Sequence, residues 1–303
     1  MEVNLVDVLF TVFDRRNRLV TDLDKGDFKV FDDNVPQTID HFTRQSDLPL
    51  RIGLLVDTSN SIRERLHFEQ DAAVDFLYNV VRRGKDQAFL MTFDDQPYVV
   101  QDYTDDVAKV RDEIMGLRAG GATAIYDAIF EAANNQLSHP PRPRGDQPDV
   151  VRRVMVLISD GDDVLSDHTK AEAIEMAQRS SVVIYTISTN SDWIGTSSQP
   201  DDAAHEHAKY RLTENDEVLK DLAEQTGGRP FFPYHVDDLN QSFLDIGDEL
   251  RCQYQLDYNP SNYRVGGPYH RIKVEVDRKG LQVRHRKGYF VRSAPVAATK
   301  PSG

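Results

Sequence analysis

Hydrophobic positions follow one pattern in the middle of the chain and another at its two ends. In the middle, nearly continuous apolar runs are separated by stretches in which apolar residues recur at helical spacing, as at Ala73, Phe76 and Leu77. Nearly continuous apolar strands are typical of a mainly parallel sheet that helices cover on both faces. The pattern therefore predicts an α/β unit with strands at residues 52–56, 88–93, 154–159 and 182–188.

Two helix boundaries can be predicted within this middle part. Thr104, followed by Asp105 and Asp106, is typical of a helix start and precedes a helical pattern over residues 107–117. A later helix carrying Leu219 and Leu222 should end at the glycine pair that begins with Gly227, since glycine favours the left-handed conformation that ends helices.

Both ends of the chain alternate apolar and polar residues, which is the period of a half-buried strand. Val6, Val8 and Phe10 alternate near the start, as do Ile272 and Val274 near the end. Residues 28–31 and 38–42 read as the two arms of a further hairpin.

Short hairpins are barely stable alone, so the two ends are expected to pair in one shared sheet. The predicted organisation has an N-terminal β segment, an α/β domain, a C-terminal β segment that pairs with the first, and a flexible tail. Their bounds are residues 1–46, 50–250, 251–293 and 294–303.

The balance of charge limits the kinds of partner. The chain of 303 residues has 36 Lys and Arg against 50 Asp and Glu, a net charge of -14, which excludes general affinity for nucleic acid or anionic membranes. Residues 254–293 are the exception, with nine basic against three acidic residues, a local +6 that leaves -20 elsewhere. We interpret this segment as the solvated face of a hairpin rather than a binding patch.

Cysteine content and hydropathy exclude further classes of site. Cys252 is the only cysteine, so the chain can form neither an internal disulfide nor a thiolate zinc cluster. No run approaches the roughly 18 apolar residues of a membrane span, which predicts no transmembrane segment. The first residues lack the basic start and apolar stretch of a signal peptide, and we expect that an export signal is missing from this sequence.

Polar side chains follow two of the predicted strands at the point where each ends. Asp57 comes directly after residues 52–56 and is followed by Ser59 and Ser61, and Asp160 comes directly after residues 154–159. In open α/β sheets, ligands bind just outside the carboxyl ends of the strands. The two carboxylates are therefore expected to converge on one spot.

A third segment adds another oxygen ligand. The loop Gly120-Gly121-Ala122-Thr123 precedes a predicted helix and supplies the hydroxyl of Thr123. Two carboxylates with neutral hydroxyls suit a hard cation, Mg²⁺ in particular. Because hydroxyls add no negative charge, such an ion can accept one more oxygen, and we expect an Asp or Glu carboxylate of a protein partner to provide it.

This constellation resembles the metal-ion-dependent adhesion site of von Willebrand factor type A domains, in which Asp57-x-Ser59-x-Ser61, Thr123 and Asp160 match in type and order. The resemblance covers residues 50–250. It implies a Rossmann-like, doubly wound, mostly parallel sheet of six strands with one antiparallel edge strand. It also implies a site for Mg²⁺, or Mn²⁺ or Ca²⁺, in which the serines bind directly and the aspartates often act through water, and a binding module rather than an enzyme.

The flanking segments also resemble a known group. Residues 24–30, 36–39, 254–262 and 281–289 are similar to a bacterial, largely acidobacterial, group of von Willebrand factor A-related proteins. That similarity implies an extracytoplasmic location, that is, periplasm, cell surface or secreted.

Three other features have simpler explanations. Arg144-Gly145-Asp146 spells an integrin-binding tripeptide, but it falls in a proline-rich loop where a chance match is favoured. His205 and His207 are better explained as part of a solvated loop than as transition-metal ligands. Asp162 and Asp163 follow Asp160 and are expected at the rim of the metal site.

Two other functions remain open from the sequence. A haloacid-dehalogenase-like, Mg²⁺-dependent phosphotransferase also has an aspartate after an apolar strand, but it needs an acidic acid/base catalyst two residues later, where this chain has Ser59. The other is an envelope structural or carbohydrate-binding protein in which the β segments carry the recognition.

Overall fold

The computed structural model describes most of the chain, in six segments. They are residues 5–45, 48–143, 150–190, 212–233, 236–261 and 269–290. The tripeptide Arg144-Gly145-Asp146, the loop with His205 and His207, and the predicted tail at residues 294–303 lie outside them.

The middle of the chain forms a six-stranded sheet in the order β10-β9-β8-β5-β6-β7. Neighbouring strands run parallel, except that β7 runs antiparallel to β6 at one edge. This arrangement confirms the expected fold class. The strands are β5 (Leu50–Asp57), β6 (Gln87–Phe93), β7 (Pro97–Thr104), β8 (Arg152–Ser159), β9 (Val182–Ser188) and β10 (Pro230–Phe231).

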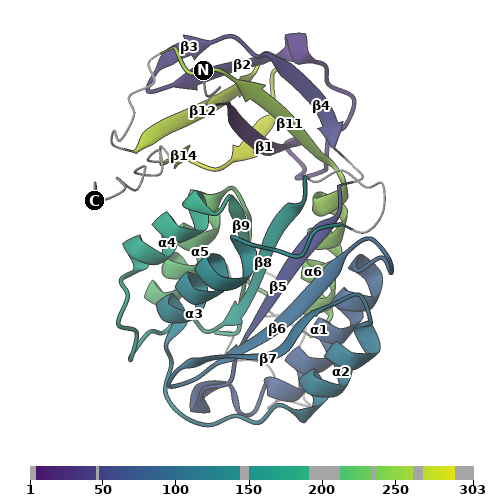
Figure 1. Ribbon diagram of the computed structural model, residues 1–303, viewed down its shortest axis with the longest axis vertical. Helices are drawn as coiled ribbons and strands as arrows, with labels where there is room; N and C mark the ends of the chain where they lie inside the picture. Colours follow the sequence, from purple (N-terminus) through teal and green to yellow (C-terminus); the bar gives the residue numbers. More distant parts are fainter. Residues whose placement is uncertain are drawn as a thin grey trace, which may run out of the picture.

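Helices cover both faces of this sheet (Figure 1). Alternate strand residues point to opposite faces, so Leu54 and Val56 pack against one group of helices and Leu55 against the other. The first group is α1 (Leu66–Val80), α2 (Val107–Gly116) and α6 (Val236–Arg251), and the second is α3 (Ile125–Glu131), α4 (Lys170–Arg179) and α5 (Glu214–Thr226). Two buried cores on a single sheet make the domain doubly wound.

The ends of the chain form a separate β-module, in which strands from the two ends pair with one another (Figure 1). The expectation of one shared sheet is wrong, because there are two four-stranded sheets, β13-β1-β11-β4 and β14-β12-β2-β3. The strands are β1 (Val6–Phe13), β2 (Phe28–Asp32), β3 (Val35–Gln37), β4 (His41–Gln45), β11 (Gln253–Tyr258), β12 (His270–Val276), β13 (Gln282–His285) and β14 (Gly288–Tyr289).

The two sheets of the β-module enclose a third buried core. Phe10 of β1 packs edge-on against Phe28 of β2 at 5.0 Å between ring centroids, and it stacks on Tyr254 of β11 at 5.5 Å. Residues more than 220 positions apart therefore share one core. Each end of the chain supplies an apolar face that the other end covers.

The β-module lies beside the amino end of the central sheet, and buried charges join the two parts. Glu249 of α6 is fully buried and accepts hydrogen bonds from Thr11 Oγ1 at 3.3 Å and Arg284 Nη1 at 3.0 Å. Within the α/β domain, Arg152, the first residue of β8, donates to the carbonyl of Leu250 and so ties α6 to the sheet at this junction. The basic C-terminal hairpin is thus only partly a solvated face, since Arg284 is used in this contact.

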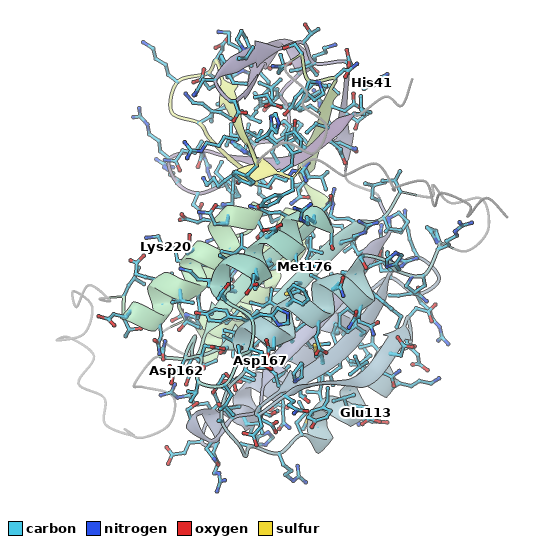
Figure 2. All side chains as sticks on the ribbon, turned by 60° about the vertical axis from the view of Figure 1, so that its left-hand side comes forward. His41, Glu113, Asp162, Asp167, Met176 and Lys220 are labelled. Carbon is cyan, nitrogen blue, oxygen red and sulfur yellow. The ribbon has the colours of Figure 1, made fainter. Side chains whose placement is uncertain are left out.

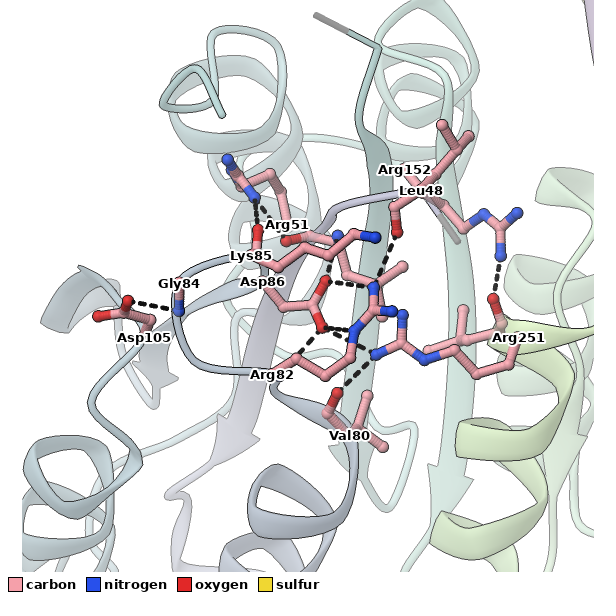
Figure 3. A network of polar contacts seen from close by, with 12 residues as sticks. Leu48, Arg51, Val80, Arg82, Gly84, Lys85, Asp86, Asp105, Arg152 and Arg251 are labelled. Carbon is pink, nitrogen blue, oxygen red and sulfur yellow. Dashed lines mark hydrogen bonds and ion pairs between the residues drawn. The ribbon is translucent and has the colours of Figure 1, made fainter. Parts of the chain in front are cut away.

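A second buried charge ties α6 to the same edge of the sheet (Figure 3). Asp86 has no exposed surface and accepts hydrogen bonds from Leu50 N at 2.8 Å, Arg82 Nε at 2.8 Å and Arg251 Nη2 at 2.8 Å. Burial alone would raise the pKa of Asp86, but the hydrogen bonds from Arg82 and Leu50 and the charge of Arg251 lower it below its usual value.

Candidate metal site

The predicted site lies where β5 and β8 end, on the side of the sheet away from the β-module. In Figure 2, Asp162 marks this end of the molecule and His41 marks the β-module. Asp57 is the last residue of β5 and is completely buried. Its Oδ1 accepts from Ser59 N at 2.8 Å, and its Oδ2 accepts from Ser159 Oγ, at the end of β8, at 2.7 Å.

The two serines lie in the loop that joins β5 to α1. Ser59 Oγ and Ser61 Oγ are 2.9 Å apart, so both hydroxyls meet at one point. Ser59 is buried and Ser61 is exposed, which puts this point at the surface. A loop with a short 3-10 turn over Asn60–Ile62 holds them there.

The glycine-rich loop is hydrogen-bonded directly to the serine loop. Gly120 N donates to Thr58 O at 2.7 Å, and Asn60 N donates to Gly121 O at 3.2 Å. Gly121 has a φ of +80°, and a Cβ there would lie 3.0 Å from Asp95 Oδ1, so a side chain does not fit. The two hydrogen bonds hold the loop that carries Thr123 against the loop that carries the serines.

The third loop follows β8 and contacts the other two. Val164 N and Leu165 N donate to Thr123 O at 2.9 and 3.0 Å, and Asp160, the residue after β8, is buried. The five predicted residues therefore lie on three loops that are hydrogen-bonded to one another. They are Asp57, Ser59, Ser61, Thr123 and Asp160.

Asp162 and Asp163 differ in their surroundings. Asp162 is exposed at the rim. Asp163 instead holds the start of α3, since its Oδ1 accepts from Ile125 N at 2.9 Å and from Ser166 Oγ at 2.6 Å. Both therefore lie outside the set of five, as the sequence suggested.

The electrostatic surroundings of Asp57 indicate whether the candidate residues suit a bound cation. Burial raises the pKa of Asp57 to about 6, although hydrogen bonds from Ser59 and Ser159 lower it, and the nearby carboxylate of Asp160 raises it further. A buried carboxylate beside another one is costly unless a positive charge compensates for both. A divalent cation bound by these oxygens would supply that charge, so the residues present fit such an ion.

Comparison with known proteins agrees with this geometry. The family model described as von Willebrand factor type A domain matches residues 52–162, a span from β5 to the loop after β8. This part of the chain is therefore similar to von Willebrand factor type A domains. No curated protein matches the sequence significantly.

Solved structures share the fold at low sequence identity. A von Willebrand factor type A protein from Catenulispora acidiphila is 10% identical with a TM-score of 0.52, and the match covers 93% of this chain and 73% of that chain. Proximal thread matrix protein 1 from the mussel byssus is 17% identical with a TM-score of 0.51, covering 73% and 51% of the two chains. A further structure of the mussel protein is 18% identical with a TM-score of 0.50, and the match covers 73% of this chain and 50% of that chain. In that structure zinc occupies the metal-ion-dependent adhesion site (MIDAS) motif.

Outside the α/β domain, the described residues contain one more group with metal-binding side chains. Asp32, Asp33 and His270 of the β-module lie close together. His270 Nδ1 is 2.8 Å from Asp32 Oδ1, while Asp32 Oδ2 accepts from the hydroxyls of Tyr258 and Tyr289. These partners satisfy both carboxylate oxygens of Asp32 without an ion.

Sequence reasoning did not single out two polar residues at the candidate metal site. Ser159 was noted only as part of the strand, yet it orients the carboxylate of Asp57. Glu69 in α1 was not considered at all, and it is the buried acid discussed below. Along the described segments, no helix is both long and apolar enough to cross a membrane.

Proposed function

We propose that this protein is a divalent-metal-dependent binding module in which Asp57, Ser59, Ser61, Thr123 and Asp160 hold Mg²⁺, or Mn²⁺ or Ca²⁺. The observation that carries the proposal is the meeting of these oxygen-bearing side chains on three hydrogen-bonded loops at the carboxyl edge of the sheet. The zinc-occupied motif of the mussel protein, which shares the fold, supports it.

The cation would supply a positive charge with a coordination position open to an outside oxygen. Three of the five ligands are neutral hydroxyls, so an Asp or Glu carboxylate of a protein partner completes the coordination. A single ionic contact cannot hold a protein partner without additional buried surface. The loops that carry Asp94, Gly121 and Asp162 surround the site and would provide that surface.

The same arrangement argues against the enzyme alternative. A phosphotransferase of the haloacid-dehalogenase type needs an acidic residue two positions after its nucleophile, and here Ser59 Oγ lies against Ser61 Oγ instead.

We further propose residues 50–250 as the binding domain, with residues 1–46 and 251–293 as the β-module, and an extracytoplasmic location. These assignments follow the resemblance of the flanking segments.

Calorimetry with Mg²⁺ and Mn²⁺ tests the site. Asp57→Ala removes a carboxylate, and the remaining ligands then cannot compete with the hydration of Mg²⁺, so binding should be lost. The double variant Ser59→Ala and Ser61→Ala should also lose it, and EDTA should release a captured protein partner. Asp162→Ala, an exposed acid on the rim, is the matched control and should bind the metal normally.

Circular dichroism of each variant checks that the fold persists. Unchanged metal binding by Asp57→Ala, or no binding by the wild type, would refute the site. A partner that stays bound in excess EDTA and to the double serine variant would refute metal-mediated binding.

A further inference from the structure

Glu69 is a buried acid without a protein partner, close to the candidate metal site. Only 1% of its surface is exposed, and both carboxylate oxygens lack a hydrogen-bond partner among the described residues. Glu69 lies in the first turn of α1, the helix that directly follows the serine loop. None of the residues assigned to the site above comes from this helix.

An unpartnered buried carboxyl group is unfavourable in either protonation state. The ionised form lacks a donor for its oxygens, and the protonated form lacks an acceptor for its O–H. A buried polar group left without a hydrogen bond is destabilising, and more so if it is charged. Since no described residue supplies a partner, water or an ion with its bound water is the natural candidate.

The charges around Glu69 identify where that partner lies. The charges that act on Glu69 most strongly are those of Asp57, Arg65 and Asp160, in that order. Two of these three are the carboxylates of the candidate metal site. Glu69 therefore lies near enough to the candidate metal site for both of its carboxylates to act on it, in the helix that packs on this face of the sheet.

We propose that Glu69 is a third carboxylate of the metal site and positions the cation by accepting hydrogen bonds from water molecules bound to it. This inference rests on the proposed function, because it needs a cation at Asp57 and Asp160. Mg²⁺ in proteins usually keeps several water molecules, and each is a strong hydrogen-bond donor. A cation with its water thus supplies the donors that the protein does not.

The position of Glu69 in α1 suits this role. A carboxylate in the first turn of a helix is favoured by the helix dipole. Its neighbour Gln70 fixes the same turn, since Gln70 Nε2 donates to Ile114 O at 2.7 Å. The turn that carries Glu69 is thus anchored to the end of α2.

Glu69→Gln tests the proposal, since it keeps the size of the side chain and removes its charge. Residues that hydrogen-bond to the groups coordinating a metal typically contribute roughly 10–100-fold to the metal affinity. The Kd of Glu69→Gln for Mn²⁺, measured by calorimetry, should therefore be roughly 10–100-fold higher than that of the wild type. Glu64→Gln is the matched control, the same change five residues earlier at an exposed position, and its Kd should equal that of the wild type.

Thermal unfolding separates this role from a structural one. In EDTA, Glu69→Gln and the apolar variant Glu69→Met should be at least as stable as the wild type, because they remove an unpartnered acid. Added Mn²⁺ should raise the Tm of the wild type more than that of either variant. Glu69→Met provides the same comparison if Glu69→Gln does not fold.

The possible results distinguish this inference from the proposed function. Equal Mn²⁺ affinity in the wild type and Glu69→Gln overturns the role of Glu69 and leaves the five-residue site intact. Variants that are much less stable in EDTA but bind Mn²⁺ normally show a purely structural role, which also overturns it. A wild type that binds no Mn²⁺ overturns the proposed function itself.

Discussion

His285 makes the stability of the β-module depend on pH. It ends β13, is buried, and its Nε2 accepts a hydrogen bond from Val274 N at 3.2 Å, while its Nδ1 lies 2.7 Å from Arg286 O. The ring is therefore neutral, with its proton on Nδ1. Burial lowers the pKa of His285 to about 4, although the Arg286 carbonyl raises it, and the charges of Lys287 and Arg286 lower it further.

The sign and size of the effect follow from the lowered pKa. Between about pH 6.5 and pH 4 the unfolded chain binds a proton at His285 that the folded protein does not, so acidification favours unfolding. The contribution of His285 to stability is complete above pH 6.5 and is lost as pH falls to 4. Lowering the pKa of His285 from 6.5 to about 4 corresponds to about 3 kcal/mol in the free energy of unfolding. About 2 kcal/mol of this contribution is lost between pH 7 and pH 5.

Urea unfolding at pH 7 and pH 5, with EDTA present, measures this contribution. His285→Gln keeps an acceptor for Val274 N but does not titrate, so the wild type should lose about 2 kcal/mol more than this variant between the two pH values. His67→Gln, at an exposed histidine of α1, is the control and should follow the wild type. If the wild type and His285→Gln lose stability in parallel, the reasoning about His285 is wrong.

Two further predictions concern how the parts of the protein hold together. Asp86→Asn leaves Arg82 and Arg251 without their buried anionic partner and should lower the free energy of unfolding by about 3–5 kcal/mol in urea titrations. A loss below about 1 kcal/mol would mean that the network contributes little. Deleting residues 1–46 removes β1 to β4 and exposes Ile272 and Val274, so the shortened chain should aggregate or lose strand signal in circular dichroism. A soluble and equally stable product would show that the C-terminal strands do not need the N-terminal ones.

Patterns of the domain that are local in sequence could be predicted well. The acidic start after Thr104 does precede α2 at Val107, and α5 ends at Thr226, directly before Gly227 with a φ of +88°. Both signals act through the backbone of a few neighbouring residues, so no distant contact can change them. That the loops with the five candidate residues meet could be predicted for a related reason, since parallel strands that end together bring their loops together.

The β-module shows where local patterns fail. The strand pattern paired residues 28–31 with 38–42, but β2 pairs with Val35–Gln37, and His41–Gln45 joins the other sheet beside β11. Alternation of apolar and polar residues says which face of a strand is buried, but not which sheet the strand joins. That choice depends on partners more than 200 residues away, such as Leu256 opposite Phe42.

Glu69 could not be predicted for a different reason. In the sequence it is one charged residue near the start of an amphipathic helix, where an acid is favoured simply by the helix dipole. Its burial depends on how α1 lies against the sheet and on the nearby end of α2, which Gln70 contacts. Only the packed structure reveals a buried acid that no described residue hydrogen-bonds.

The distance between the site and the β-module limits where partner specificity can lie. The eight residues of β5 span roughly 26 Å from the amino edge of the sheet to Asp57. A partner carboxylate at the site is therefore far from the β-module, whose buried charges face the opposite edge. Next to the site, Val164 and Leu165 are 61% and 47% exposed while their backbones are fixed by Thr123. Because apolar surface held rigidly beside an ionic contact adds affinity, the proposed metal-mediated binding predicts that these loops select the partner.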